Sequence, residues 1–139
     1  MRGRLAAGLV ALLALGCGTS KVVPVSGKVT LDGVPLANAK VNFQPLGDGK
    51  VSPGLGSYAK TNEQGEFSLM MVDKSGPGAV VGKHRVEISA FEKEKRDPTD
   101  DRERQPPDKV PARYNTRSEL TFEVPPGGTA EASFPLTTR

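Results

Sequence analysis

The chain has 139 residues, a length that predicts a single domain. Glycine (16) and proline (12) are frequent, whereas aromatic residues make up 5% and tryptophan is absent, which favours many short elements joined by turns over long helices. The net charge is only +3, so the chain offers no strongly basic face and few rings on which bases could stack. We therefore expect no nucleic-acid partner.

Residues 1–16 have the layout of a bacterial export signal. Arg2 and Arg4 form a short positive region, and Leu5–Gly16 is an uncharged apolar run of 12 residues. A helix needs about 20 residues to span a bilayer, so the run is too short for a membrane span but suits the apolar part of a signal peptide. Cleavage after Gly16 would leave 123 residues with nearly balanced charge, 17 basic against 16 acidic.

The run ends in Leu13-Ala14-Leu15-Gly16-Cys17, which resembles the lipobox of bacterial lipoproteins. The resemblance implies cleavage before Cys17, a diacylglycerol on its sulfur and acylation of its new amino terminus. Ala14 stands where the family prefers leucine. Cys17 is the only cysteine, so the chain can form no internal disulfide. Two other interpretations stay open here: an ordinary signal peptide with an incidental cysteine, or an N-terminal core segment.

A lipid on Cys17 predicts how the remaining chain is organised. Residues 17–23 would form a lipidated tether, and residues 24–139 would form the folded domain. Stable anchoring takes two or more acyl chains, which a triacylated cysteine supplies. Gly18 stands where an aspartate would retain a lipoprotein at the inner membrane. By that resemblance we expect a cell-envelope location at the outer membrane, on its periplasmic or surface face, with the membrane as partner through Cys17.

Apolar and polar residues alternate in short segments through the domain, which is the pattern of half-buried strands. Asp32-Gly33 follows the first of these strands and predicts a type I′ hairpin turn, because both central positions need positive φ. Turn signals recur every 8–12 residues or so, typical of a β-sandwich or barrel. The alternation predicts seven strands, over residues 25–31, 39–44, 57–61, 66–71, 83–90, 120–124 and 130–136.

The same alternation predicts which side chains are buried. We expect the core to contain the inward-facing phenylalanines Phe43, Phe67, Phe122 and Phe134. Lys40 and Asn42 are expected to point to solvent. In the last strand, Ala130 is expected to share the inward face with Ala132, Phe134 and Leu136.

Three stretches resemble carboxypeptidase regulatory-like domains, and the whole layout is similar to small bacterial lipoproteins that carry such a domain. The resemblance covers residues 24–91 and extends to the end through Pro111–Asn115 and the last two strands. It implies an all-β fold, a transthyretin-like (prealbumin-like) seven-stranded Greek-key β-sandwich. The matching positions are glycines, prolines and core residues, which specify a fold better than a function. The stretches are Val25-Ser26-Gly27-Lys28-Val29 with the following Asp32-Gly33, Pro35-Leu36 and Ala39-Lys40-Val41, then Thr61–Leu69, then Gly82–Val86.

Catalytic residues, cofactors and metal ligands are not expected. His84 is the only histidine, and we expect it to be a strand-end residue with a satisfied hydrogen bond. The transthyretin-like hydroxyisourate hydrolases use several histidines and end in Tyr-Arg-Gly-Ser, whereas this chain ends in Pro135–Arg139. Lipidation of Cys17 would exclude a Cys–His pair. The last predicted strand contains no asparagine, so no Lys–Asn isopeptide bond is expected there.

Residues 92–109 are dominated by charge, with 13 charged residues of 18. Such a segment cannot bury enough apolar surface to offset its ordering entropy, so we expect a flexible loop at 92–110. A docking loop for an envelope protein and a merely solvated loop are equally compatible with this composition. A calcium site is disfavoured because Arg96, Arg102 and Arg104 are interleaved with its only candidate ligands, which are Asp97, Asp100, Asp101 and Glu103.

These features predict a non-enzymatic, lipid-anchored module of the cell envelope with a structural or protein-binding role. The alternative is an envelope domain that binds a glycan or peptide ligand. The absence of tryptophan and a tyrosine count of two argue against glycans, because sugars stack on aromatic rings.

Overall fold

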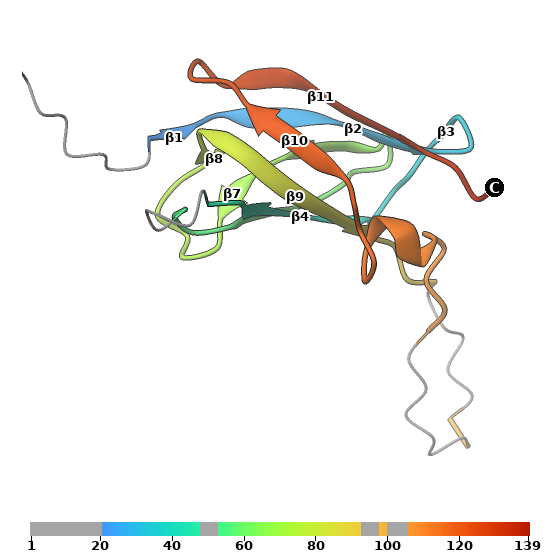
Figure 1. The fold of residues 1–139 in the computed structure, drawn as a ribbon. Coiled ribbons are helices and arrows are strands. Elements are labelled where there is room, and N and C mark those ends of the chain that lie inside the picture. The colour runs from blue at the N-terminus through green and yellow to red at the C-terminus, as the bar shows by residue number, and fades with distance from the viewer. Residues whose placement is uncertain (1–20, 48–52, 93–97, 100–105) are drawn as a thin grey trace, which may run out of the picture.

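The computed structural model describes residues 21–47, 53–92, 98–99 and 106–139, and it is all-β (Figure 1). The described residues contain no α-helix and a single short 3-10 helix, η1 (Ala112–Tyr114). The strands are β1 (Val22–Val23), β2 (Val25–Leu31), β3 (Val34–Pro35), β4 (Lys40–Pro45), β5 (Ser57–Lys60), β6 (Glu66–Ser68), β7 (Met70–Met71), β8 (Ala79–Val80), β9 (Gly82–Ser89), β10 (Thr121–Val124) and β11 (Thr129–Leu136).

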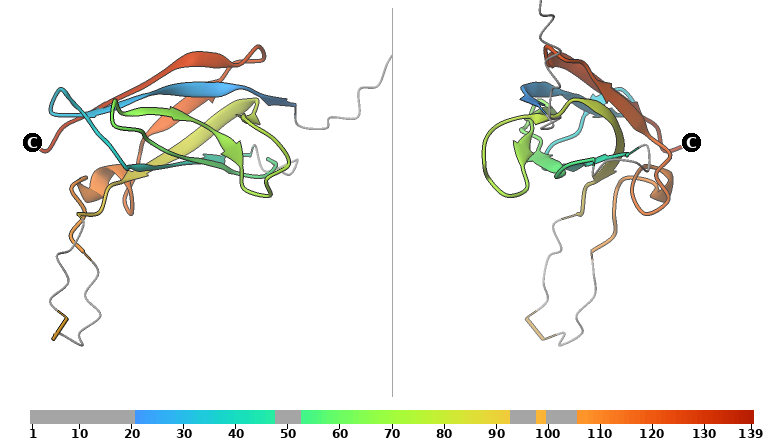
Figure 2. Two further views of the ribbon diagram at one scale, coloured as in Figure 1. Left: turned by 180° about the vertical axis from the view of Figure 1, so that it is seen from behind. Right: turned by 60° about the vertical axis from the view of Figure 1, so that its left-hand side comes forward.

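Two larger sheets face each other across the core (Figures 1 and 2). One has the order β10-β9-β4-β5-β7. The other has the order β11-β2-β3, with β6 also paired to β2. A small third sheet joins β1 to β8. All pairs are antiparallel except β11 with β2, the last and first long strands, which run parallel.

The core between the sheets is built around Phe43, which is 1% exposed. Its ring centroid lies 6.4 Å from that of Phe67, 5.7 Å from that of Phe122 and 5.9 Å from that of Phe134. These contacts confirm the predicted aromatic core, with Phe122 half-buried at its margin. Full burial of one large apolar side chain contributes roughly 1.5–3 kcal/mol, so this cluster is a main source of stability.

The turn after β2 has the predicted backbone. Asp32 has φ 51° and Gly33 has φ 81°, and the turn pairs Leu31 with Val34. Positive φ at both central residues gives the twist that a tight hairpin needs. The predicted faces of β4 are also confirmed, because Lys40 and Asn42 are exposed.

The prediction for Ala130 is wrong. Its side chain is exposed, whereas Ala132, Phe134 and Leu136 are buried as expected. The β11–β2 register shifts between Thr129 and Ala132. The inward–outward alternation of β11 therefore begins only at Ala132. At this irregularity the two backbones come close: a Cβ on Gly27 would stand 1.7 Å from the carbonyl oxygen of Ala132.

This close approach yields a test. Gly27→Ala should lower the free energy of unfolding by about 2 kcal/mol or more, because the backbone of β11 must shift to admit a methyl group. The matched control is Gly127→Ala, since a Cβ at Gly127 meets nothing within 4 Å. Urea melts of both variants measure the difference. Equal stability of the two variants would contradict the close packing of β2 against β11.

Candidate functional site

Several residues singled out by the sequence lie outside the described residues. They are the predicted lipidation residue Cys17 and the disfavoured calcium ligands Asp97, Asp100, Asp101 and Glu103. Both predictions therefore stay predictions. Within the described ranges, no helix is long and apolar enough to cross a membrane, and no group of three or more histidine, cysteine or acidic residues could hold a metal ion.

His84 lies inside the sandwich near the start of β9 and is fully buried. Its Nδ1 is 3.0 Å from the carbonyl oxygen of Gly82, and its ring centroid is 5.6 Å from that of Phe43. Burial lowers the pKa of His84, so the ring is neutral at pH 7 and Nδ1 carries the proton that the carbonyl accepts. The predicted hydrogen bond is present at Nδ1, whereas Nε2 has no partner among the described residues. We interpret His84 as part of the aromatic core.

The two ends of the charged segment are pinned against the end of β9. The Asp108 carboxylate accepts hydrogen bonds from the backbone N–H of Ala90 at 2.8 Å and of Val110 at 2.9 Å. Lys109 N–H donates to the carbonyl of Ala90, and Glu92 N–H donates to the carbonyl of Pro107. Val110 is buried in the core. Residues 92 and 107–110, which the sequence placed in a flexible loop, therefore form a paired base.

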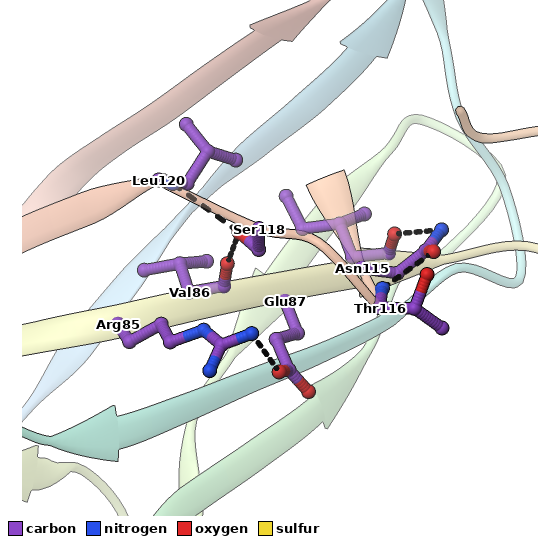
Figure 3. Close-up of polar contacts among 8 residues, drawn as sticks. Arg85, Val86, Glu87, Asn115, Thr116, Ser118 and Leu120 are labelled. Atoms are coloured by element: carbon purple, nitrogen blue, oxygen red, sulfur yellow. Dashed lines mark hydrogen bonds and ion pairs between the residues drawn. The ribbon is translucent and has the colours of Figure 1, made fainter. Parts of the chain in front are cut away.

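Asn115 extends this base along β9. Its side-chain amide lies 3.2 Å from Asp108 Oδ2, 3.2 Å from the carbonyl oxygen of Val110 and 3.3 Å from that of Ile88. A little further on, the Ser118 hydroxyl donates to the carbonyl of Val86 in β9, as Figure 3 shows. We call Asp108 and Asn115 the loop clamp. The hydrophobic periodicity of the sequence did not predict the loop clamp, because Asp108 and Asn115 lie in segments without alternation and resemble ordinary loop residues.

A second polar cluster ties down the C-terminus. The Arg113 guanidinium donates to the carbonyls of Thr137 and Arg139, and Thr137 N–H donates to Tyr114 Oη at 3.3 Å. On the other side, Thr138 donates from its backbone and its hydroxyl to the Asp32 carboxylate, at 3.0 and 2.7 Å. We call Asp32, Arg113, Tyr114, Thr137 and Thr138 the C-terminal cluster.

Hydrogen bonds and nearby charges lower the pKa values of two acidic groups in the C-terminal cluster. Hydrogen bonds from Thr137 and Arg113 lower the pKa of Tyr114 to about 8, since they stabilise the phenolate. The hydrogen bonds from Thr138 lower the pKa of the Asp32 carboxyl in the same way. Both acids are solvent-accessible, so the cluster can accept a proton from solvent or release one.

The outer faces of both sheets are hollowed into open grooves. The larger, about 670 Å³, crosses β11, β2 and β6 and is lined by residues of both charges, among them Lys28, Lys60, Asn62, Glu66 and Glu131. The smaller, about 430 Å³, lies beside the β4–β5 connection. Its lining includes the apolar residues Pro45, Leu55 and Val72 and the acidic residue Glu87. Neither lining includes a histidine or a cysteine.

Comparisons of the chain with protein families, with curated proteins and with solved structures found no match.

The loop clamp predicts which part of the charged segment can be removed without loss of stability. Replacing residues 93–105 with a short Gly-Ser linker should change the free energy of unfolding by less than about 1 kcal/mol, because loop-closure cost depends only weakly on length. Replacing residues 92–109 should cost about 2 kcal/mol or more, since two backbone N–H groups lose their acceptor on Asp108. Urea melts compare the two proteins. A large cost for the shorter replacement would mean that residues 93–105 pack or bind an ion.

The Tyr114 phenol gives a pH test. Absorbance titration of the folded protein should show a tyrosine ionising near pH 8, and Tyr114→Phe should remove that step whereas Tyr58→Phe should not. The sign follows from linkage: a lowered pKa in the folded state means that stability relative to Tyr114→Phe rises with pH between about 8 and the ordinary value of 10. A step that persists in Tyr114→Phe would contradict the assignment.

Proposed function

We propose that the protein is a non-enzymatic, lipid-anchored module of the cell envelope with a structural or protein-binding role. One observation carries the proposal: Cys17 directly follows an uncharged apolar run that begins after Arg2 and Arg4, which is the layout of a lipoprotein signal. The first strand begins at Val22, only five residues after Cys17. Gly18 favours delivery to the outer membrane.

The proposed fold is the transthyretin-like Greek-key sandwich of carboxypeptidase regulatory-like domains. Two features support it. Seven described strands are three residues or longer, namely β2, β4, β5, β6, β9, β10 and β11. In addition, β9 returns to pair with β4 after the chain has passed through β6 in the opposite sheet, which is the kind of non-local return that a Greek key makes.

A role in binding or scaffolding suits the distribution of polar groups better than catalysis does. The single histidine is buried beside Phe43, with its proton held by a backbone carbonyl. The described polar networks, the loop clamp and the C-terminal cluster, hold backbone segments in place. These networks fix the base of the charged segment and the C-terminus, which makes this end of the domain a rigid platform for an envelope partner.

Ligand binding is the second candidate, and the groove across β11, β2 and β6 favours it. Its lining contains two lysines, Lys28 and Lys60, and two glutamates, Glu66 and Glu131, which suits a polar peptide that carries both charges. A glycan is a poorer fit, because Phe67, the only aromatic residue in the lining, is buried.

Lipid attachment is the part of this function that a single substitution tests. Cells expressing the full chain and fed a tagged fatty acid should label the protein, and Cys17→Ser should abolish the label and move the protein to the soluble fraction. Ser20→Ala, in the same tether, should keep both the label and the membrane association. Label that survives Cys17→Ser would show that the lipid proposal is wrong.

A further inference from the structure

One end of the sandwich collects the N-terminus and the loops that lie closest to it. Val81 N–H donates to the carbonyl of Lys21, and Leu46 N–H donates to the carbonyl of Lys83. On the adjoining loops, Val72 N–H donates to the carbonyl of Gly56. In Figures 1 and 2, β1 and β8 lie at this end and the C-terminus lies at the other. We call the exposed residues Lys21, Val22, Leu46, Leu55, Val72 and Lys83 the N-terminal pole.

The N-terminal pole is unusually apolar for an exposed end. Val22 is 40% exposed, Leu46 45%, Leu55 50% and Val72 49%. Seven large hydrophobic residues are exposed in the described part of the chain, and these four gather here, whereas Val34, Tyr58 and Phe91 lie elsewhere. Single exposed hydrophobic residues are ordinary, but a group of them at one end indicates a surface that contacts something.

Lysines surround this apolar group. Lys21 and Lys83 are exposed on it, and Lys74 is exposed in the turn after Val72. Among the described residues, the acidic ones at this end are Asp73, Glu123 directly across from Lys83 on β10, and Glu87, which lines the same groove as Leu55 and Val72. Aliphatic side chains bordered by lysines match the boundary between acyl chains and anionic headgroups, where apolar groups enter the membrane and lysines reach the phosphates.

The length of the tether decides which surface this end can reach. Only three residues separate Cys17 from Lys21, and an extended chain spans at most about 3.5 Å per residue, or about 14 Å in all. A lipid on Cys17 would therefore hold the N-terminal pole beside the bilayer at a high effective concentration, so even weak surface affinity would seat it. No feature of the described residues would hold a protein partner or a second copy close to this end in the same way.

We propose that the N-terminal pole is a membrane-contact surface that rests on the lipid interface and orients the domain. This inference depends on the proposed function, because it takes the lipid on Cys17 as given. It implies that the loop clamp and the C-terminal cluster face away from the bilayer, since they lie at the far end of the sandwich (Figure 2). The surface open to an envelope partner is then the end that carries the charged segment.

The absence of tryptophan makes a fluorescence test direct. Full-chain lipoprotein carrying Leu46→Trp or Leu55→Trp is compared with Val34→Trp, whose position is 64% exposed in the β2–β3 turn region at the opposite end. Each is reconstituted into phosphatidylethanolamine–phosphatidylglycerol vesicles with or without acyl chains brominated near the headgroup. We expect bromine to quench Leu46→Trp and Leu55→Trp at least twofold more than Val34→Trp. Lys21→Glu combined with Lys83→Glu should reduce that quenching.

The outcomes separate the inference from the proposed function. If the fatty-acid label is present but the two pole tryptophans are quenched no more than Val34→Trp, the contact surface is overturned and the lipid anchor stands. Pole tryptophans that are blue-shifted yet insensitive to bromine would show that protein, such as a second copy, covers this end, which also overturns the inference. If the protein carries no label and leaves the vesicles, the proposed function and this inference both fall.

Discussion

The parallel pairing of β2 with β11 joins residues more than 100 positions apart in the chain, and the second sheet and the C-terminus are positioned by it. β2 lies between β11 on one edge and β3 and β6 on the other, so the second sheet is assembled around it. The contact requires a residue without a Cβ at Gly27, because Ala132 O occupies that space. A parallel pair of this kind forms only after a long loop has closed, so its stability depends on the core packed beneath it.

The position of β11 in turn fixes the C-terminal cluster. Because β11 runs alongside β2 to Leu31, the residues after Leu136 arrive beside the turn at Asp32, where Thr138 donates to the carboxylate. η1 approaches the same point from the other sheet and supplies Arg113 and Tyr114. Three segments distant in the sequence thus meet at one end of the sandwich. Their exposed hydrogen bonds add little stability individually, but they hold the terminus in one place.

The two ends of the sandwich differ in chemistry, and this difference connects structure to function. The N-terminal pole is aliphatic and bordered by lysines, whereas the opposite end holds the loop clamp, the C-terminal cluster and the base of the charged segment. A module proposed to sit on a membrane and to meet another envelope component needs two such faces. Between them the core is closed, and its single titratable ring, His84, is kept neutral by burial.

Local chemistry was sufficient to predict the longer strands, most inward faces and the turn. It predicted residues 66–71 as one strand, however, whereas the structure divides them into β6 and β7 in different sheets. Alternation placed Phe43 and Phe67 inside and Lys40 outside, and Asp32-Gly33 predicted positive φ, because these properties depend only on the period of a strand and the sterics of a residue. The N-terminal segment was likewise interpreted from sequence alone, and that interpretation is a proposal about residues outside the described ranges.

Tertiary structure decided the rest. Ala130 faces solvent because the register of β11 against β2 shifts between Thr129 and Ala132, and a periodic pattern contains no information about a neighbour so far away in the chain. Asp108 looked like one more charge in a polar segment, yet its carboxylate accepts two backbone hydrogen bonds and carries the chain back onto β9. The amino-acid sequence by itself determined where the longer strands lie and which side chains are apolar. Only the packed structure determined which strands meet and which polar groups find partners, because those contacts join residues that are distant in sequence and close only in space.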